Sequence, residues 1–455
     1  AGNPGRFLDF VGTYDRDILE KYRTGADLDL YPNSDWMELL SEHTTNQRYT
    51  INFRGGSEKT KFFASGAYYK EDGIFDSNTS EGYNANTGLQ RFNLRSNVDM
   101  DITSTTKLSI DLSGQYKTRS QSASSSDAVF GAITVCPVFI IPFYYSDGSL
   151  SQLTREADQR TNPYNLLNQS GYTKTWSASV QSKVQLEQKL DFITQGLKFI
   201  GRFGFDTWNK NNIDRIKWPE QYKAQRFRDE NGQIVFDRVT EEQKMKQTSS
   251  AEGNRNEIFE AELHYNRGFK EHHVGGILKF NQDSKVFTVG TGEDLKKGIA
   301  RRHLGLAGRV SYNWNYRYFA DFNFGYNGSE NFADGHRFGF FPAVSVAWNV
   351  AEEPIIKKNF KWMNMFKIRY SFGKVGNDVL KIGNDEYRFP YLYTIGDGTG
   401  YTWADYNYSN SYSGKRYTDL ASNYATWEIA TKHDLGVDLA LFNDCLLYTS
   451  PSPRD

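Results

Sequence analysis

The stretch KLSIDLSGQYK, residues 107–117, alternates apolar and polar side chains along its whole length. Successive side chains of an extended chain point to opposite faces, so this alternation predicts a β-strand with one apolar and one polar face. The residues of the apolar face are Leu108, Ile110, Leu112, Gly114 and Tyr116. What this face packs against therefore decides the fold.

The same period of two recurs along most of the chain. Six further segments show it most clearly: 175–187, 197–207, 304–314, 318–327, 366–373 and 433–441. We count about fourteen candidate strands, many of them about 10 to 14 residues long, whereas strands of soluble proteins average about 5–6 residues. Strands of about 9–11 residues or more, tilted, are long enough to cross a bilayer. The pattern therefore predicts an all-β protein with strands of membrane-spanning length.

The connections between these strands are unequal in length. Three are tight, at 104–107, 268–272 and 314–317. Long polar stretches alternate with them, at roughly 71–90, 119–172, 210–250, 285–302 and 376–425. Short turns at one end and long loops at the other are typical of outer-membrane barrels. The lengths favour a transmembrane antiparallel β-barrel.

Aromatic side chains make up 15% of the sequence and gather at strand ends. The set is Tyr116, Trp176, Trp208, Trp314, Tyr316, Tyr318, Trp348 and Trp427. Such residues form girdles at the two membrane interfaces of a barrel. The apolar register of the strands quoted above carries no charge, and a charge at mid-membrane would cost about 2–4 kcal/mol. The open alternative is a soluble sandwich or propeller, whose strands are shorter and whose turns recur about every 8–12 residues.

The polar register would then line a lumen. Its charged residues are of both signs: Lys198, Arg202, Arg309, Lys367 and Arg369 against Asp111, Glu187, Asp206, Asp321 and Asp438. The net charge of the whole chain is −1, which argues against a nucleic-acid-binding protein, since these carry a basic excess. A mixed lumen of this kind does not select strongly for one sign of charge.

Several other features narrow the class. The two cysteines, Cys136 and Cys445, provide neither a disulfide framework nor a metal-ligand spacing. No run of about 18 apolar residues is present, and the nearest, 131–145, is interrupted by Pro137 and Pro142. Since this run is rich in Val, Ile and Phe, a packing or partner surface is expected there rather than a ligand site.

The sequence contains none of the common motifs of catalytic or metal-binding sites. There is no G-x-S-x-G, H-E-x-x-H, P-loop or EF-hand pattern, so we expect no enzyme activity, no cofactor and no metal site. His272 and His273 favour a solvated turn over a metal site. Glu260, Glu262 and His264 share the polar face of one strand, where charges that face the lumen are the default interpretation.

One loop offers candidate ligand-binding residues. The segment 391–420 combines tyrosines and a tryptophan with Asp, Asn and Ser. Aromatic faces can stack on sugar rings or peptides. The candidates are Tyr393, Tyr401, Trp403, Tyr406, Tyr408 and Tyr412. A self-packed loop, or a surface that docks a partner, is the competing interpretation.

Several segments together resemble a known family. They are 33–40, 53–74, 91–103, 318–355, 367–378 and 427–444, which resemble, in order, parts of the SusC/RagA-type TonB-dependent outer-membrane transporters. One departure is Tyr326-Asn327-Gly328, where the family more often has Arg-x-Asp-Gly. The resemblance implies a 22-stranded barrel in the outer membrane of a Gram-negative bacterium. It also implies an N-terminal plug that contacts the TonB complex, and a SusD-like surface lipoprotein that helps to capture glycans or peptides.

The resemblance also implies how this chain divides. We expect residues 1–47 to be a lead-in to the early barrel and 48–444 to be a partial barrel of about fourteen strands, with plug and TonB box outside this sequence. The last residues, CLLYTSPSPRD (445–455), break the alternation and match a translated transposase adapter used in DNA library preparation, so we predict that they are not native. Active import is the first functional hypothesis; a passive porin or barrel adhesin is the second, and a soluble glycan-binding protein the third.

Overall fold

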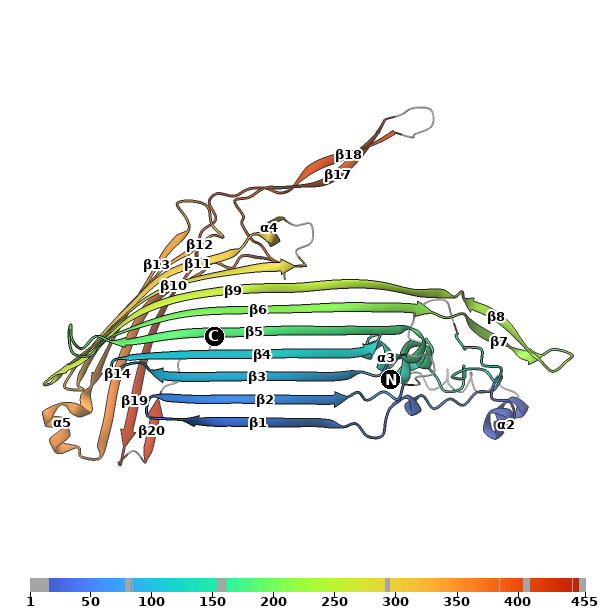
Figure 1. Cartoon of the computed structure of the whole chain (residues 1–455), viewed down its shortest axis with the longest axis horizontal. Coiled ribbons are helices and arrows are strands. Elements are labelled where there is room, and N and C mark those ends of the chain that lie inside the picture. Colours follow the sequence, from blue (N-terminus) through green and yellow to red (C-terminus); the bar gives the residue numbers. More distant parts are fainter. Residues whose placement is uncertain are drawn as a thin grey trace.

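Fourteen strands form one antiparallel sheet in the computed structural model of the chain (Figure 1). The structure describes residues 16–77, 83, 85–153, 161–290, 295–383, 385–403, 410–443 and 445–449. The strand order is β1-β2-β3-β4-β5-β6-β9-β10-β11-β12-β13-β14-β19-β20, so every strand pairs with its neighbour along the chain except where a small hairpin intervenes. The predicted all-β class and the count of about fourteen strands are confirmed.

The strands of the sheet are long. Their bounds are β1 Asn46–Gly56, β2 Thr60–Asp72, β3 Gly88–Asp101, β4 Thr106–Ser122, β5 Gly171–Lys189, β6 Leu197–Trp218, β9 Gln243–Phe269, β10 His272–Val289, β11 Arg301–Trp314, β12 Tyr318–Ser329, β13 Phe338–Asn349, β14 Met363–Asn377, β19 Glu428–Leu441 and β20 Leu446–Thr449. Among the residues that the structure describes, three two-stranded sheets lie outside it: β7 Gln221–Arg228 with β8 Ile234–Thr240, β15 Lys381–Ile382 with β16 Asp385–Glu386, and β17 Thr394–Trp403 with β18 Asn410–Asp419.

Helices are few and short. They are α2 Arg16–Thr24, η1 Trp36–Leu39, α3 Ser126–Val135, the π-helical turn η3 Asn165–Gln169, α4 Leu295–Gly298, η4 Val350–Glu352 and α5 Pro354–Asn359. Within the described part of the chain, none has the length and apolar character to cross a membrane.

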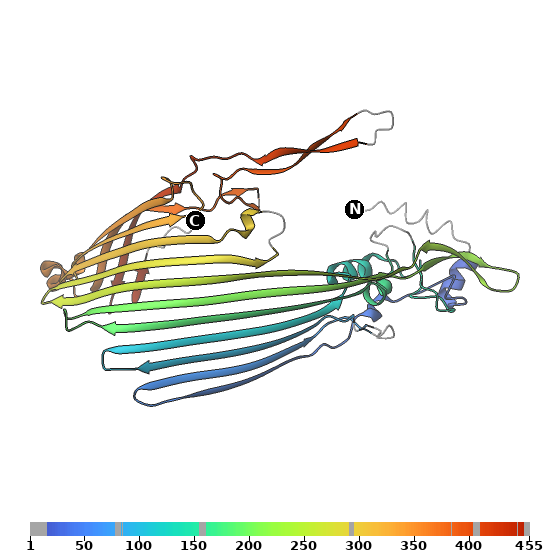
Figure 2. The same cartoon turned by 45° about the horizontal axis from the view of Figure 1, so that its top comes forward.

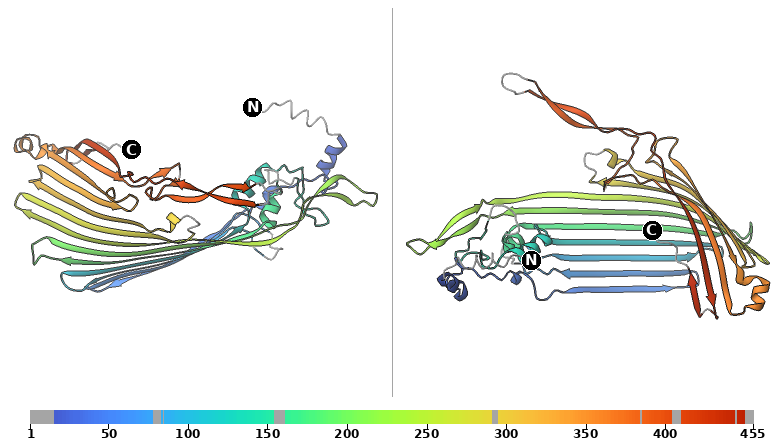
Figure 3. Two further views of the ribbon diagram at one scale, coloured as in Figure 1. Left: turned by 90° about the horizontal axis from the view of Figure 1, so that it is seen from above. Right: turned by 180° about the vertical axis from the view of Figure 1, so that it is seen from behind.

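The sheet is a curved wall whose two edges stay apart. Figures 2 and 3 show it bending round so that β14, β19 and β20 rise on one side and β1 to β4 lie on the other. Among the described residues, β1 and β20 stand at the two edges and do not pair with each other. The wall therefore has a concave inner face and a convex outer face.

The register keeps the apolar residues of neighbouring strands on one face. Ile110 of β4 lies opposite Val98 of β3 and Val184 of β5, and Val184 lies opposite Phe203 of β6. Phe203 in turn lies opposite Phe259 of β9. Because a shift by one residue would invert every side chain, this continuity fixes the register across the sheet. The predicted apolar face of residues 108–116 is thus one strip of an apolar band that continues through Phe203 and Phe259.

Short and long connections alternate between the two ends of the sheet, as predicted. The short-turn end has links at 57–59, 102–105, 270–271 and 315–317; the long-loop end has the segments 73–87, 123–170, 219–242 and 378–427. Asn315 and Tyr316 both adopt positive φ, at 50° and 55°, as tight hairpin turns require.

One predicted loop is largely strand. Residues 210–250 were expected to be a long polar connection, yet β6 continues to Trp218 and β9 resumes at Gln243. The remainder of the segment holds the β7–β8 hairpin. Alternation of polarity ends near Trp208, but backbone pairing continues because the ladder needs only its own N–H and C=O groups.

A ladder of stacked aromatic rings crosses four strands at the short-turn end. His272 of β10 stacks on Trp314 of β11 at 6.5 Å between centroids, Trp314 on Tyr318 at 5.7 Å, and Tyr318 on Trp348 of β13 at 6.4 Å. The hydroxyl of Tyr318 and the indole N–H of Trp348 both donate to Glu353, at 2.7 and 3.0 Å. Apolar rings with polar atoms aimed at one end are typical of a membrane-interface girdle.

Two of the predicted girdle residues lie elsewhere. Trp208 lies in the polar register of β6, opposite Ser179 and Asn254. Trp427 precedes β19, packs on Phe341 at 5.2 Å and donates to the carbonyl of Arg337 at 3.0 Å. Trp427 does lie at a strand end, whereas Trp208 lies in the middle of β6, because this strand continues to Trp218.

The predicted division of the chain is not tested by these elements. β1 begins at Asn46, close to the expected boundary at residue 47, and β20 pairs Leu446–Thr449 with Asp438–Leu441 of β19. A short paired strand says nothing of the origin of its codons. The non-native origin of 445–455 therefore stays a prediction.

Candidate functional site

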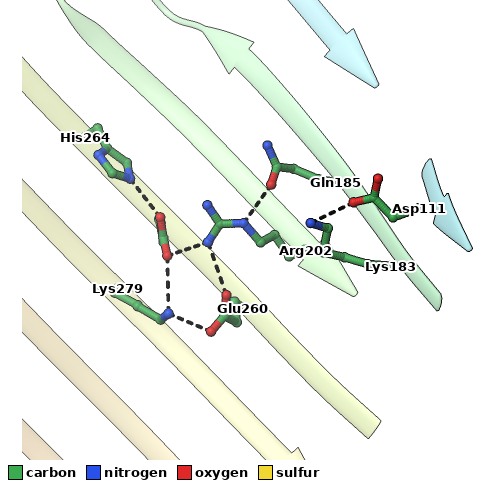
Figure 4. A network of polar contacts seen from close by, with 8 residues as sticks. Asp111, Lys183, Gln185, Arg202, Glu260, His264 and Lys279 are labelled. Carbon is green, nitrogen blue, oxygen red and sulfur yellow. Dashed lines mark hydrogen bonds and ion pairs between the residues drawn. The ribbon is translucent and has the colours of Figure 1, made fainter. Parts of the chain in front are cut away.

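The polar register of the sheet forms the candidate site's inner wall. Arg202 of β6 lies opposite Gln185 of β5 and Glu260 of β9, so their side chains share the face that the apolar residues leave free. Figure 4 shows these side chains pointing toward one another from neighbouring strands. The alternation predicted from the sequence is what brings them together.

Six charged or polar groups form one network on this wall. Arg202 Nη1 lies 2.6 Å from Glu262 and 3.1 Å from Glu260, and its Nε donates to Gln185 at 2.8 Å. Lys279 of β10 lies 2.6 Å from Glu260 and 3.3 Å from Glu262. His264 reaches Glu262 at 2.8 Å. The side chain of Glu262 is only 9% exposed. Two cations thus share two carboxylates, and the network links β5, β6, β9 and β10.

This arrangement does not favour acid–base chemistry. Each carboxylate of the network already accepts from two or more donors, whereas a general base must meet the proton of a substrate. Glu257 of the same strand lies in the opposite register, opposite Phe205, and pairs with Arg255 at 3.2 Å. Glu260, Glu262 and His264 share the polar face of β9, as the alternation of the sequence predicted; that this face lines a lumen stays a prediction.

Further ion pairs between acidic and basic side chains lie along the same face. Their members are Asp111 with Lys183 at 2.7 Å, Lys198 with Glu187 at 3.5 Å, Arg309 with Asp321 at 3.0 Å and Arg369 with Asp438 at 3.3 Å. Hollows lie between them, of about 300 Å³ beside Asp111 and Lys183 and about 310 Å³ beside Asp321 and Arg369. The wall is polar, has hollows between its side chains and carries balanced charges of both signs; the polar character and the charge balance were predicted from the sequence.

A latch at the long-loop end holds the 378–427 segment against the sheet. Asp378 accepts from His303 of β11 at 3.2 Å, and Ser329 of β12 donates to it as well. His303 also contacts Asp283 of β10 at 3.0 Å, and Asn331 donates to the carbonyl of Asp378 at 2.8 Å. The hydrogen bond from His303 lowers the pKa of the Asp378 carboxyl. These contacts anchor the loop to β10, β11 and β12, which are distant from it in sequence.

A compact loop body covers the long-loop end near β2–β5. Its apolar core combines η1, α3 and η3: Trp36, Leu39, Phe75, Val129, Ile133, Cys136, Ile141, Tyr164 and Leu167. The predicted run 131–145 contributes Ile133, Cys136 and Ile141 to this core. Val138, Phe139 and Tyr144 from the same run stay 41%, 42% and 54% exposed. The run thus both packs inward and presents apolar side chains outward.

Polar contacts fasten this body to the β7–β8 hairpin. Arg228 of β7 binds Asp27 through two nitrogens, at 2.7 and 2.9 Å, and Asp29 accepts from the backbone N–H of Ser146 at 2.8 Å. The hydrogen bond from Arg228 lowers the pKa of the Asp27 carboxyl. Tyr145, 2% exposed, accepts from the N–H of Ala224 at 2.9 Å, and its burial raises the pKa of its phenol to about 12.

The predicted ligand-binding residues fall on and around the β17–β18 hairpin, which projects from the long-loop end (Figure 1). Tyr401 lies opposite Tyr412, and the two are 65% and 63% exposed. Tyr393 is 62% exposed and packs edge-on against Tyr417 at 5.6 Å. Trp403 ends β17, while Tyr406 and Tyr408 lie outside the described residues. The structure thus brings two of the six together as a cross-strand pair; ligand contact by any of them stays a prediction.

Sequence reasoning missed the latch, the loop body and the Asp27–Arg228 contact. All three join segments far apart in the chain, and none leaves a local period or spacing. No group of three or more His, Cys, Asp or Glu among the described side chains is placed to hold a metal ion.

Comparison with known proteins adds a family context. No family model matches the chain. TonB-dependent receptor P3 of Formosa agariphila is 25% identical over 96% of this chain and 42% of its own length, and TonB-dependent receptor P39 of the same organism is 24% identical over 92% and 39%. TonB-dependent receptor SusC of Bacteroides thetaiotaomicron is 26% identical over 30% of this chain and 13% of its own length. The chain thus spans about two fifths of the curated relatives that it matches over most of its length.

Solved structures support the same fold. The RagAB peptide importer in its closed-closed state aligns with a TM-score of 0.62 over 90% of this chain and 44% of that chain, at 14% identity. A second RagAB structure, described as a peptide transporter, gives the same TM-score over 91% and 44%. Over nearly its whole length the chain is therefore similar in sequence to TonB-dependent receptors, over 30% of its length it is similar to SusC, and in fold it is similar to RagAB.

Proposed function

We propose that this chain is part of the barrel of a TonB-dependent transporter that imports oligosaccharides or peptides across the outer membrane, together with a SusD-like surface lipoprotein. The observation that carries the proposal is the similarity to TonB-dependent receptors over 96% of the chain, since a shared fold alone does not imply a shared function. The plug, the TonB box and the strands that complete a barrel would belong to the rest of the protein.

Three features of the structure support a transport role. A continuous apolar outer face with an aromatic girdle suits a lipid environment, so we place the protein in the outer membrane. A charge-balanced inner wall suits the passage of polar, uncharged or zwitterionic solutes. The exposed apolar side chains of the loop body, Val138, Phe139 and Tyr144, suit contact with a surface lipoprotein at the long-loop end.

The β17–β18 hairpin is the proposed capture element. Its paired tyrosines, Tyr401 and Tyr412, offer exposed aromatic faces beyond the end of the sheet, where an arriving solute would meet them. Exposed aromatic faces can contact sugar rings or peptide side chains, which favours these solutes over small inorganic ones.

The test is uptake by the full-length protein in its own bacterium. A deletion strain is grown on defined oligosaccharides and on defined peptides as sole carbon source, beside a strain that lacks the TonB box. We expect both strains to lose growth on the same class of oligomer while keeping growth on its monomers. Growth that depends on the protein but survives loss of the TonB box would replace active import by a passive porin.

A pair of variants tests the hairpin within that assay. Tyr401→Ala with Tyr412→Ala is expected to slow uptake about three- to tenfold at low solute concentration, because two stacking faces are lost. Tyr424→Ala, which removes a tyrosine that is 87% exposed but outside the hairpin, is the matched control and is expected to leave uptake unchanged. Equal uptake by both variants would remove the hairpin from the proposal and leave the import proposal standing.

A further inference from the structure

A positively charged patch lies on the outer face of the sheet, beyond the end of its apolar band. The outer register of β5 runs from Leu186 through Val184 and Val180 to Trp176, and then to Lys174 and Tyr172. Ten residues of strand from Leu186 to Trp176 span about 33 Å. At a tilt of about 40° this is a height of about 25 Å, the height of the lipid-facing band of a barrel. Lys174 therefore lies where lipid headgroups begin.

The neighbouring strand places an arginine at the same level. Tyr172 of β5 lies opposite Arg215 of β6, and Lys174 lies opposite Ile213, so Arg215 and Lys174 project from the same face. Arg215 in turn lies opposite Gln247 of β9. We call Lys174, Tyr172, Arg215 and Lys217 the headgroup patch.

Two cations of the headgroup patch converge on one ring. The guanidinium carbon of Arg215 lies 5.3 Å from the ring centroid of Tyr172, and Nζ of Lys174 lies 5.6 Å from the same centroid. Arg215 Nη1 donates to the hydroxyl of Tyr172, and its Nε donates to Gln247 at 3.0 Å. These partners are neutral, so they orient the guanidinium without cancelling its charge. Lys217 adds a third positive charge and lies 5.6 Å from the ring of Tyr83, which packs on Tyr172.

The carboxylates of this part of the sheet lie on its other face. Asp214 accepts from Thr173 at 2.8 Å, and Glu252 lies 3.8 Å from Lys210, all in the inner register. Among the described residues, the outer register of β4, β5, β6 and β9 beyond Trp176 contains the three cations and no Asp or Glu. In this part the outer face thus carries only cations, whereas the inner face carries charges of both signs.

We propose that the headgroup patch binds a phosphate group of a lipid headgroup in the outer leaflet. Arginine presents parallel N–H donors that match phosphate oxygens, and a basic side chain next to an anionic membrane surface adds about 1 kcal/mol of attraction. A lipid rather than a free phosphate is the occupant, because the patch faces outward and the apolar strip of Val180 and Val184 below it can hold acyl chains. The proposal rests on the outer-membrane position and is independent of import.

The test uses the full-length protein in detergent with fluorescent diphosphoryl lipid A as the probe. The variant combines Lys174→Gln with Arg215→Gln. The matched control combines Lys210→Gln with Lys246→Gln, which removes the same charge from the inner register of β6 and β9. We expect the variant to bind the probe about ten- to thirtyfold more weakly and the control to bind like the unmodified protein, since about 1 kcal/mol is lost for each cation.

Two further arms keep the outcome decisive. The unmodified protein is titrated with dephosphorylated lipid A, which is expected to bind about as weakly as the variant binds the phosphorylated probe. Inorganic phosphate in millimolar excess is expected not to displace the probe, because it lacks the acyl chains. Equal binding of phosphorylated and dephosphorylated lipid, or equal loss in variant and control, would overturn the proposal even if the variant folds poorly. Solute uptake is measured separately, so failure of the headgroup patch leaves the import proposal intact.

Discussion

The lower and upper parts of β5, β6 and β9 are the same strands in two different settings. In the lower part, Val184, Phe203 and Phe259 lie side by side on the outer face, while Arg202, Glu260 and Glu262 form a network on the inner face. In the upper part, β6 and β9 stay paired from Asn209 to Trp218, but both faces are mostly polar. The ladder of backbone hydrogen bonds is common to both parts; the chemistry of the faces is not.

The difference separates two causes of the alternation of polarity: the pairing of the backbone, and the surroundings of each face of the strand. Backbone pairing makes a strand, and it needs no particular side-chain pattern. The surroundings of each face decide which side chains are tolerated, because lipid excludes charge and water does not. The point at which alternation ends, near Trp208 in β6 and Trp176 in β5, therefore marks the edge of the apolar band rather than the end of the strand.

The largest expected effect comes from a charge on the outer face of the lower part. Phe203→Arg puts a guanidinium into the apolar band and is expected to destabilise the folded protein by about 2–4 kcal/mol. Ile213→Arg, on the outer face of β6 in its upper part, is the matched control, with an expected effect of about 0–1 kcal/mol. The measurement is urea unfolding of the full-length protein in lipid vesicles. Equal effects at the two positions would remove the distinction between the two parts.

A smaller effect is expected from carboxylates on the inner face. Glu262→Gln leaves Arg202 and Lys279 with one charged partner fewer in a half-buried network and is expected to destabilise by about 1–3 kcal/mol. Glu252→Gln, on the inner face of the upper part, removes a carboxylate that is 57% exposed and 3.8 Å from Lys210. It is expected to change stability by less than about 0.5 kcal/mol. The same unfolding assay compares them, and a reversed order would show that the network is not the tighter of the two.

The smallest effect is a pH dependence of the loop body. Arg228 lowers the pKa of Asp27, and a carboxyl whose folded pKa is lowered stabilises the folded state above its unfolded pKa of about 4. This stability, about 0.5–1 kcal/mol for a largely surface pair, is lost as the pH falls through the folded pKa. The hydrogen-exchange protection factors of residues 27–31 and 221–228, which correct for the slower intrinsic exchange at low pH, are expected to fall between about pH 7 and about pH 3.

The Arg228→Gln variant is the control for that measurement. Without the guanidinium, the pKa of Asp27 is expected to return toward its usual value and the pH dependence of exchange in these residues to become weaker. An undiminished pH dependence in the variant would assign the effect to another group. The comparison thus shows whether the contact between Asp27 and Arg228 holds the loop body and the β7–β8 hairpin together.

The lower part of the sheet could be predicted from the sequence in detail. The apolar face of residues 108–116 and the inner-face charges Arg202, Arg309 and Asp321 were all placed by alternation alone. This succeeds because an apolar face and a polar face impose opposite demands on successive residues. The same rule failed for residues 210–250, where both faces are mostly polar and leave no alternation to detect.

The loops could be predicted only in composition. The run 131–145 was expected to form a packing or partner surface. The sequence did not predict that Ile133 of this run would pack in one core with Trp36 and Phe75. The tyrosines of 391–420 were identified as exposed, whereas the latch that anchors their segment, Asp378 on His303, joins residues with no common spacing. Long-range contacts of this kind are set by tertiary packing and leave no trace in local periodicity.

The connectivity of the sheet has a kinetic consequence. Because almost every strand pairs with the next along the chain, each hairpin closes over a short loop such as 57–59 or 270–271, and the entropy lost at each step is small. Three joins are different: β4 meets β5 across 123–170, β6 meets β9 across 219–242, and β14 meets β19 across 378–427. Loop closure is slowest where the intervening chain is longest, so these joins set the pace of assembly. The loop body packs part of the first link, the hairpin β7–β8 shortens the second, and the anchoring of Asp378 shortens the third, by fixing part of the connecting chain before the strands meet.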